Sequence, residues 1–106
     1  MSARRPRIEL IYDDDCPNVG LARDRLREAC RRARVEPAWV EWSRSDAEAP
    51  GYVQAHGSPT ILVDGADPFV EPEIAAGRCR VYRTEGGLDR APPVADLENA
   101  LRAGSG

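Results

Sequence analysis

The chain lacks several features that mark common classes of protein. No window among its 106 residues approaches the roughly 18 consecutive apolar residues of a membrane span. The start, Met1 to Arg7, reaches Ile8 without a secretory apolar region, so a cytoplasmic location is expected. Lysine is absent, and the 15 basic residues are arginines that scatter along the chain and point to no function. With 18 acidic residues and a net charge of -3, we expect neither nucleic acid nor membrane as a partner.

Cysteine is scarce, and its arrangement limits what sulfur can do. The three cysteines stand at positions 16, 30 and 79 with no C-x-x-C pair. Neither a disulfide framework nor a four-cysteine zinc or iron–sulfur site can be built from one such chain. Any sulfur chemistry must therefore use one thiol or one pair of thiols, and no cofactor is expected.

The hydrophobic pattern predicts one α/β domain. We expect a flexible N-terminus over 1–6, a single domain over 7–103 and a frayed C-terminus over 104–106. Short apolar runs predict strands, and apolar residues at three- and four-residue steps predict helices. The expected order is βαβ, a weak helix, then ββα, with strands at 7–12, 38–42, 60–63 and 79–82, an amphipathic helix over 19–35, a short or broken helix over 47–55 and a last helix opening at 92–93.

Two segments carry a resemblance to a known family. Tyr12-Asp13-Asp14-Asp15-Cys16-Pro17-Asn18 joins the first strand to the first helix, and Gly57-Ser58-Pro59-Thr60 leads into a later strand. Over nearly the whole chain this pattern resembles the thioredoxin superfamily, and most of all short bacterial thioredoxin-like proteins that are often labelled alkylmercury lyase-like. One departure is Val19, which stands where thioredoxins carry a second cysteine.

The resemblance implies both a fold and a site. The fold is a four-stranded mixed sheet with a cis-proline loop, in which the bond between Ser58 and Pro59 is cis. Backbone groups of that loop would then pair with an extended peptide or a thiol compound beside Cys16. A trans Pro59 at the start of a strand is the alternative.

Cys16 is the predicted nucleophile because of its place before a helix. Helix amides and the helix dipole stabilise a thiolate, which is the reactive and soft-metal-binding form of cysteine. The charges of Asp13, Asp14 and Asp15 oppose this effect, and the outcome depends on where those carboxylates point. The alternative is a helix-capping loop with an unreactive thiol.

The remaining candidate residues are Cys30, Cys79 and His56. Cys30 lies roughly 21 Å along the helix from Cys16 and is expected in the core. If the third and fourth strands form a hairpin, Cys79 lies at the end opposite Pro59, roughly 10–13 Å from the cysteine motif, and its parity with Val81 points it into the core. A register shift in the loop over 66–77 would instead make Cys79 a second thiol or metal ligand. His56 is either a base near Cys16 or a solvated side chain.

Three functions compete. The first is monothiol chemistry, in which Cys16 attacks a disulfide or an electrophile, Ser58 and Pro59 orient the partner, and an outside thiol resolves the product. In its organomercurial variant an aspartate, Asp15 or one of its two neighbours, protonates carbon. The second is a non-catalytic module that holds a protein or small ligand in the groove at Pro59. The third is capture of a soft metal by Cys16 and Cys79.

Overall fold

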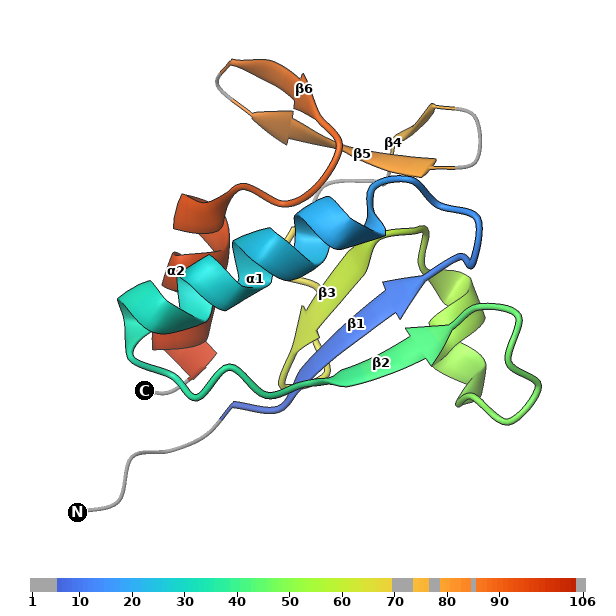
Figure 1. The fold of residues 1–106 in the computed structure, drawn as a ribbon, viewed down its shortest axis with the longest axis horizontal. Helices are drawn as coiled ribbons and strands as arrows, with labels where there is room; N and C mark the ends of the chain where they lie inside the picture. Colours follow the sequence, from blue (N-terminus) through green and yellow to red (C-terminus); the bar gives the residue numbers. More distant parts are fainter. Residues whose placement is uncertain (1–5, 70–73, 77–78, 85, 105–106) are drawn as a thin grey trace.

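Two small sheets and two α-helices make up the described part of the chain (Figure 1). The computed structural model describes residues 6–69, 74–76, 79–84 and 86–104, and the side chains at 74–76 and 79 lie outside that description. The elements follow the chain as β1 (Ile8–Tyr12), α1 (Val19–Ala33), β2 (Val40–Ser43), the 3-10 helix η1 (Gly51–Ala55), β3 (Thr60–Val63), β4 (Ile74–Ala76), β5 (Cys79–Thr84), β6 (Gly87–Asp89) and α2 (Val94–Gly104).

The main sheet is mixed and has the order β2-β1-β3. Strands β1 and β2 are parallel, with Glu9 opposite Val40, because α1 carries the chain back between them. Strand β3 is antiparallel to β1, with Leu10 opposite Ile61. The predicted α/β class and the three strands that form this sheet are therefore confirmed.

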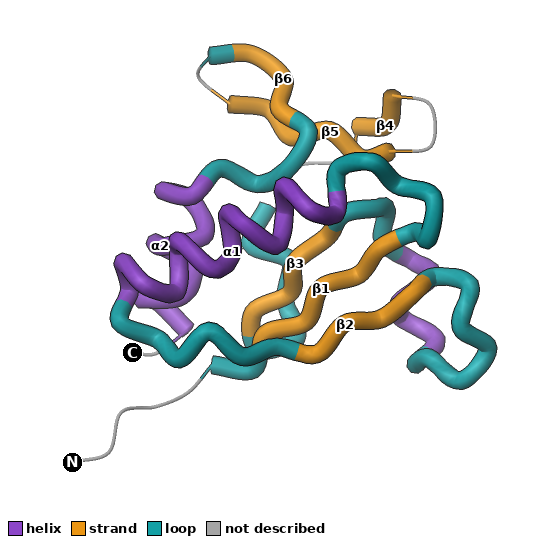
Figure 2. Tube along the Cα trace, viewed as in Figure 1, coloured by secondary structure: helices purple, strands orange, loops and turns teal. Residues whose placement is uncertain are grey.

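The two α-helices cover one face of this sheet, and η1 lies against the other (Figures 1 and 2). On the helix side, Leu10 of β1 packs in one core with Leu26 of α1 and Leu97 of α2, all fully buried. On the opposite side, Ile11 of β1 meets Val53 of η1 in a smaller core. Because side chains alternate along β1, the strand contributes apolar side chains to both cores. Among the described residues, no helix combines the length and the apolar character needed to cross a membrane.

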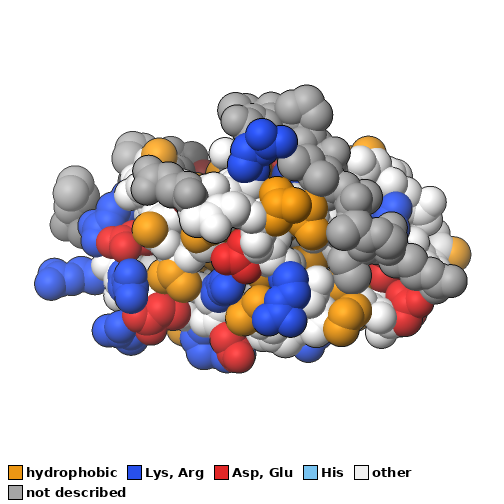
Figure 3. Space-filling model, turned by 90° about the horizontal axis from the view of Figure 1, so that it is seen from above, with side chains coloured by type: hydrophobic (Ala, Val, Ile, Leu, Met, Phe, Trp, Pro, Cys, Tyr) orange, Lys and Arg blue, Asp and Glu red, His pale blue; other side chains and the backbone are white. Residues whose placement is uncertain are grey.

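Helix α1 ends two residues before the predicted limit. Arg34 adopts the left-handed conformation at φ 58°, and the Val35 N–H donates to the Cys30 carbonyl oxygen at 2.9 Å, which closes the helix. The exposed arginines of α1 have acidic partners, such as Arg31 with Glu28. On the face that Figure 3 shows, acidic and basic side chains are intermixed.

The predicted fourth strand does not join the main sheet. Strand β5 pairs instead with β4 and β6 in a second, antiparallel sheet, with Val81 opposite Ile74 and Tyr82 opposite Asp89. Strands β4 and β6 were not expected from the sequence, and they provide the backbone partners that β5 needs. The four-stranded mixed sheet is therefore replaced, in the described residues, by two sheets of three strands.

Glu9 is a buried acidic side chain on the η1 face of the main sheet. Only 2% of its side chain is exposed. Its Oε2 atom accepts hydrogen bonds from the Trp42 indole N–H at 2.9 Å and from the Tyr52 hydroxyl. The exposed Arg7 guanidinium lies 3.6 Å from its Oε1 atom. These bonds tie β1, β2 and η1 together.

Candidate functional site

Cys16 lies in the loop between β1 and α1, as predicted. Its backbone N–H donates to the Asp13 carbonyl oxygen at 3.0 Å, and its partly exposed side chain packs against the core beneath α1. Helix α1 begins at Val19, so Cys16 stands two residues before the cap position, Asn18. The first turn of α1 contains no acidic side chain to offset the positive end of the helix dipole.

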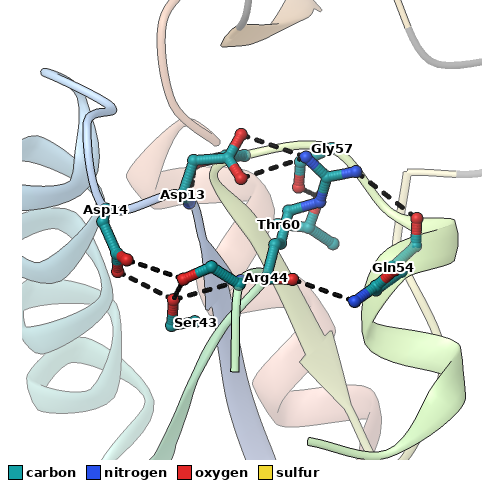
Figure 4. A network of polar contacts seen from close by, with 9 residues as sticks. Asp13, Asp14, Ser43, Arg44, Gln54, Gly57 and Thr60 are labelled. Atoms are coloured by element: carbon teal, nitrogen blue, oxygen red, sulfur yellow. Dashed lines mark hydrogen bonds and ion pairs between the residues drawn. The ribbon is translucent and has the colours of Figure 1, made fainter. Parts of the chain in front are cut away.

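The Asp13 carboxylate points to Arg44, at the end of β2 (Figure 4). One guanidinium nitrogen of Arg44, Nη1, lies 3.0 Å from each carboxylate oxygen. The second terminal nitrogen reaches the Gln54 carbonyl oxygen at 3.4 Å, and the Gln54 amide donates to the Arg44 carbonyl oxygen at 3.0 Å. The charge of Asp13 is therefore paired with Arg44, which is itself hydrogen-bonded to η1.

Asp14 points to the same end of β2 but to different partners. Its two carboxylate oxygens accept hydrogen bonds from the hydroxyls of Ser43 and Ser45, each at 2.7 Å (Figure 4). The bond from Ser45, followed by that from Ser43, holds the pKa of Asp14 below its ordinary value. Asp15 is exposed at the tip of the loop. The Asp13 and Asp14 carboxylates are thus both bound at the end of β2.

A hydrogen bond joins the proline loop, residues 57–60, to the cysteine loop, residues 13–18 between β1 and α1. The Asp13 N–H donates to the Ser58 hydroxyl oxygen at 2.8 Å. The bond between Ser58 and Pro59 is cis, as predicted, and both residues are buried. Within the loop, the Thr60 hydroxyl donates to the Gly57 carbonyl oxygen at 2.7 Å. The segments before α1 and before β3 therefore meet at one edge of the main sheet.

Strand β5 is hydrogen-bonded to the proline loop. The Arg80 N–H donates to the Ser58 carbonyl oxygen at 2.7 Å, and the Tyr82 hydroxyl donates to the Pro59 carbonyl oxygen. The buried Arg80 guanidinium also donates to the Thr60 hydroxyl oxygen at 2.9 Å and lies 2.8 Å from the Asp67 carboxylate. Two of the loop's backbone groups, the Ser58 and Pro59 carbonyl oxygens, thus accept hydrogen bonds from within the chain.

This placement of β5 corrects the predicted position of the beginning of the strand that contains Cys79. The beginning of β5 lies beside Ser58, next to Pro59, and not at the opposite end of β3, because β5 is not the hairpin partner of β3. The buried side chains of β5 include Arg80 and Tyr82, at 3% and 2% exposure, whereas Val81 is only partly buried. The Cys79 side chain, and with it the proposed pairing with Cys16, lies outside the described residues.

Cys30 and His56, the other two candidate residues, lie in different parts of the structure. Cys30 is fully buried in the core, as expected, and burial raises the pKa of its thiol to about 11. His56 follows η1, and its Nδ1 atom lies 4.0 Å from the Asp67 carboxylate. The structure thus places His56 at the polar cluster formed by Asp67 and Arg80. Among the described residues, no three histidine, cysteine or acidic side chains form a cluster that suits a metal ion.

Arg44 and Arg80 are the site residues that the sequence did not indicate. Arg44 pairs with a carboxylate three residues before Cys16, and Arg80 contacts the proline loop with both its backbone and its side chain. The local sequence contains no signal for either role, because their partners lie far away along the chain.

Comparison with known proteins yields no match, whether to a family model, a curated protein or a solved structure.

Proposed function

We propose that the chain is a thioredoxin-like protein that carries out monothiol thiol–disulfide exchange through Cys16. The observation that carries this proposal is the 2.8 Å hydrogen bond from the Asp13 N–H to the Ser58 hydroxyl oxygen, because it joins the cysteine loop to the cis-proline loop. The order β2-β1-β3, with β3 directly after the cis bond and both α-helices on one face, agrees with the resemblance.

The surroundings of Cys16 also favour a reactive thiol. Cys16 is partly exposed, whereas Cys30 is fully buried, and attack on a small disulfide requires a thiol that is not enclosed in the core. Asp13 and Asp14, two of the charges that oppose a thiolate, are directed to Arg44 and to the two serine hydroxyls. The positive end of α1, which begins three residues after Cys16, also stabilises negative charge on this loop.

The proposed reaction exchanges one disulfide for another without a net change in oxidation state. The Cys16 thiolate attacks one sulfur of a small disulfide, forms a mixed disulfide and releases the other half as a thiolate, which takes a proton from water. A small cellular thiol, as its thiolate, then attacks the partner's sulfur in the mixed disulfide. This step forms a new small disulfide and returns Cys16 as a thiolate.

Mass spectrometry of the intact protein tests this proposal. The reduced protein is mixed with a small disulfide at neutral pH, and the modified residue is located by peptide mapping. We expect one adduct on Cys16, its loss in the Cys16→Ser variant, and its removal by added thiol. Cys79→Ser serves as the matched control and should still form the adduct. The proposal fails if Cys16 stays unmodified while the denatured chain reacts.

A non-catalytic binding module is the second candidate. The observation in its favour is that the Ser58 and Pro59 carbonyl oxygens already accept hydrogen bonds from Arg80 and Tyr82. An unreactive Cys16 in the experiment above would favour this function. An internal disulfide between Cys16 and Cys79 would instead indicate a two-thiol mechanism, and an organomercurial reaction would need Asp15 as the acid.

A further inference from the structure

The Asp13–Arg44 ion pair joins the cysteine loop to the end of β2. Because the Cys16 N–H donates to the Asp13 carbonyl oxygen at 3.0 Å, the two residues close a tight turn. The Cα atoms at the ends of such a turn lie within about 7 Å of each other. Asp13 and Cys16 are therefore ends of the same turn, and an unpaired carboxylate on that turn would act against a thiolate on it.

Arg44 is held in place by two other segments of the chain, the end of β1 and η1. Its backbone N–H donates to the Tyr12 carbonyl oxygen at 2.8 Å, which extends the pairing of β1 with β2 by one residue. The Gln54 side chain, from η1, donates to the Arg44 carbonyl oxygen at 3.0 Å. The side chains of Arg44 and Asp13 are 31% and 22% exposed, so the pair is partly shielded from water. This is a fixed charge pair, in contrast to the exposed pairs along α1.

We propose that Arg44 is a positioning residue for Cys16, which keeps the Asp13 carboxylate paired and thereby prevents its charge from suppressing the thiolate. This proposal rests on the proposed function, because it treats Cys16 as the working thiol. The other carboxylates of the loop differ: Asp14 is bound by two serine hydroxyls, and Asp15 is exposed. Arg44 is the cation that pairs with Asp13, at the start of the turn that Cys16 closes.

The rate of alkylation of Cys16 at one neutral pH tests the proposal with four variants. Iodoacetamide attaches to the thiolate and releases iodide, so its rate follows the thiolate fraction. Arg44→Gln leaves a negative charge and should slow the reaction about threefold, whereas Asp13→Asn leaves a positive charge and should speed it by about as much. The double variant should return to the wild-type rate, and Arg44→Lys, which keeps the cation, should stay close to it.

The two single variants should change the alkylation rate in opposite directions, and the double variant should cancel both changes. This pattern distinguishes an electrostatic role of Arg44 from a structural one. If Arg44 only supports the fold, Arg44→Gln and the double variant will show the same altered rate, and the proposal is overturned. Equal rates for Arg44→Gln and the wild type overturn it as well. Asp13→Asn decides the question if Arg44→Gln does not fold, because an unchanged or slower rate contradicts the proposal.

The control variant is Arg102→Gln, which removes an arginine of α2 that pairs with Glu98, and should leave the rate unchanged. Failure of the proposed function gives a different result. Cys16 would then form no mixed disulfide in the wild type, while the ratios among these variants would still report the effect of Arg44.

Discussion

Replacement of Glu9 by alanine should destabilise the protein by about 2–4 kcal/mol. Each of the two hydrogen bonds to the buried carboxylate, from Trp42 and Tyr52, is of a kind that contributes about 1.5–3 kcal/mol when the acceptor is charged. The contact with Arg7 adds little, since that side chain is 64% exposed. Folding of Glu9→Ala no longer desolvates a carboxylate, and this gain offsets part of the stability lost with the two hydrogen bonds. The expected destabilisation is therefore smaller than the sum of the two hydrogen-bond contributions.

Glu9→Gln separates the hydrogen bonds from the charge. The amide oxygen still accepts from the Trp42 indole N–H, so we expect a smaller loss of about 1–2 kcal/mol. Urea unfolding followed by tryptophan emission gives the free energy of unfolding of both variants. If the slope of this free energy against urea concentration is the same as in the wild type, the unfolded states are comparable. The exposed Glu48→Ala is the control and should change the free energy of unfolding by less than about 0.5 kcal/mol. A loss below about 1 kcal/mol for Glu9→Ala, or equal losses for both variants of Glu9, would refute the reasoning.

Two further predictions follow from buried or paired groups. Because burial raises the pKa of Cys30 from 9.0 to about 11, the folded protein holds that proton more tightly, and the free energy of unfolding should fall as pH rises from 9.0 to about 11. Cys30→Ala should flatten this part of the pH profile, and a profile unchanged in the variant would exclude the assignment. The hydrogen bonds from Arg23 are the main cause that lowers the pKa of Glu41 below 4.5, so stability present above pH 4.5 should be lost on further acidification. Glu41→Gln should lose less stability over that range, as measured by thermal unfolding, and an equal loss would contradict the role of this pair.

Local sequence patterns predicted the elements whose causes are local. The three- and four-residue spacing of apolar residues predicted the buried side of α1, and Val19, Leu26 and Cys30 are all buried. The end of α1 was predicted too late, because Arg34 takes a left-handed conformation that glycine adopts most readily. The cis bond before Pro59 followed from the family resemblance and is confirmed.

The partner of β5 was not predictable in the same way. Alternation along 79–82 correctly indicated a strand, but alternation does not specify which strand pairs with it. The choice depends on β4 and β6, two short strands of three residues each with weak patterns of their own. The side chains that face the core were therefore assigned to the wrong parity, with Val81 in place of Tyr82.

The effect of the charges around Cys16 could not be predicted from the sequence. In the sequence, Asp13 stands three residues before the cysteine and counts against a thiolate. Its partner, Arg44, is 31 residues away and is one of 15 arginines with nothing local to distinguish it. The parallel pairing of β1 with β2 brings the ends of these strands together, and so places the arginine where it cancels the charge. The same aspartate that argues against a reactive cysteine in the sequence is thereby compatible with one in the folded chain.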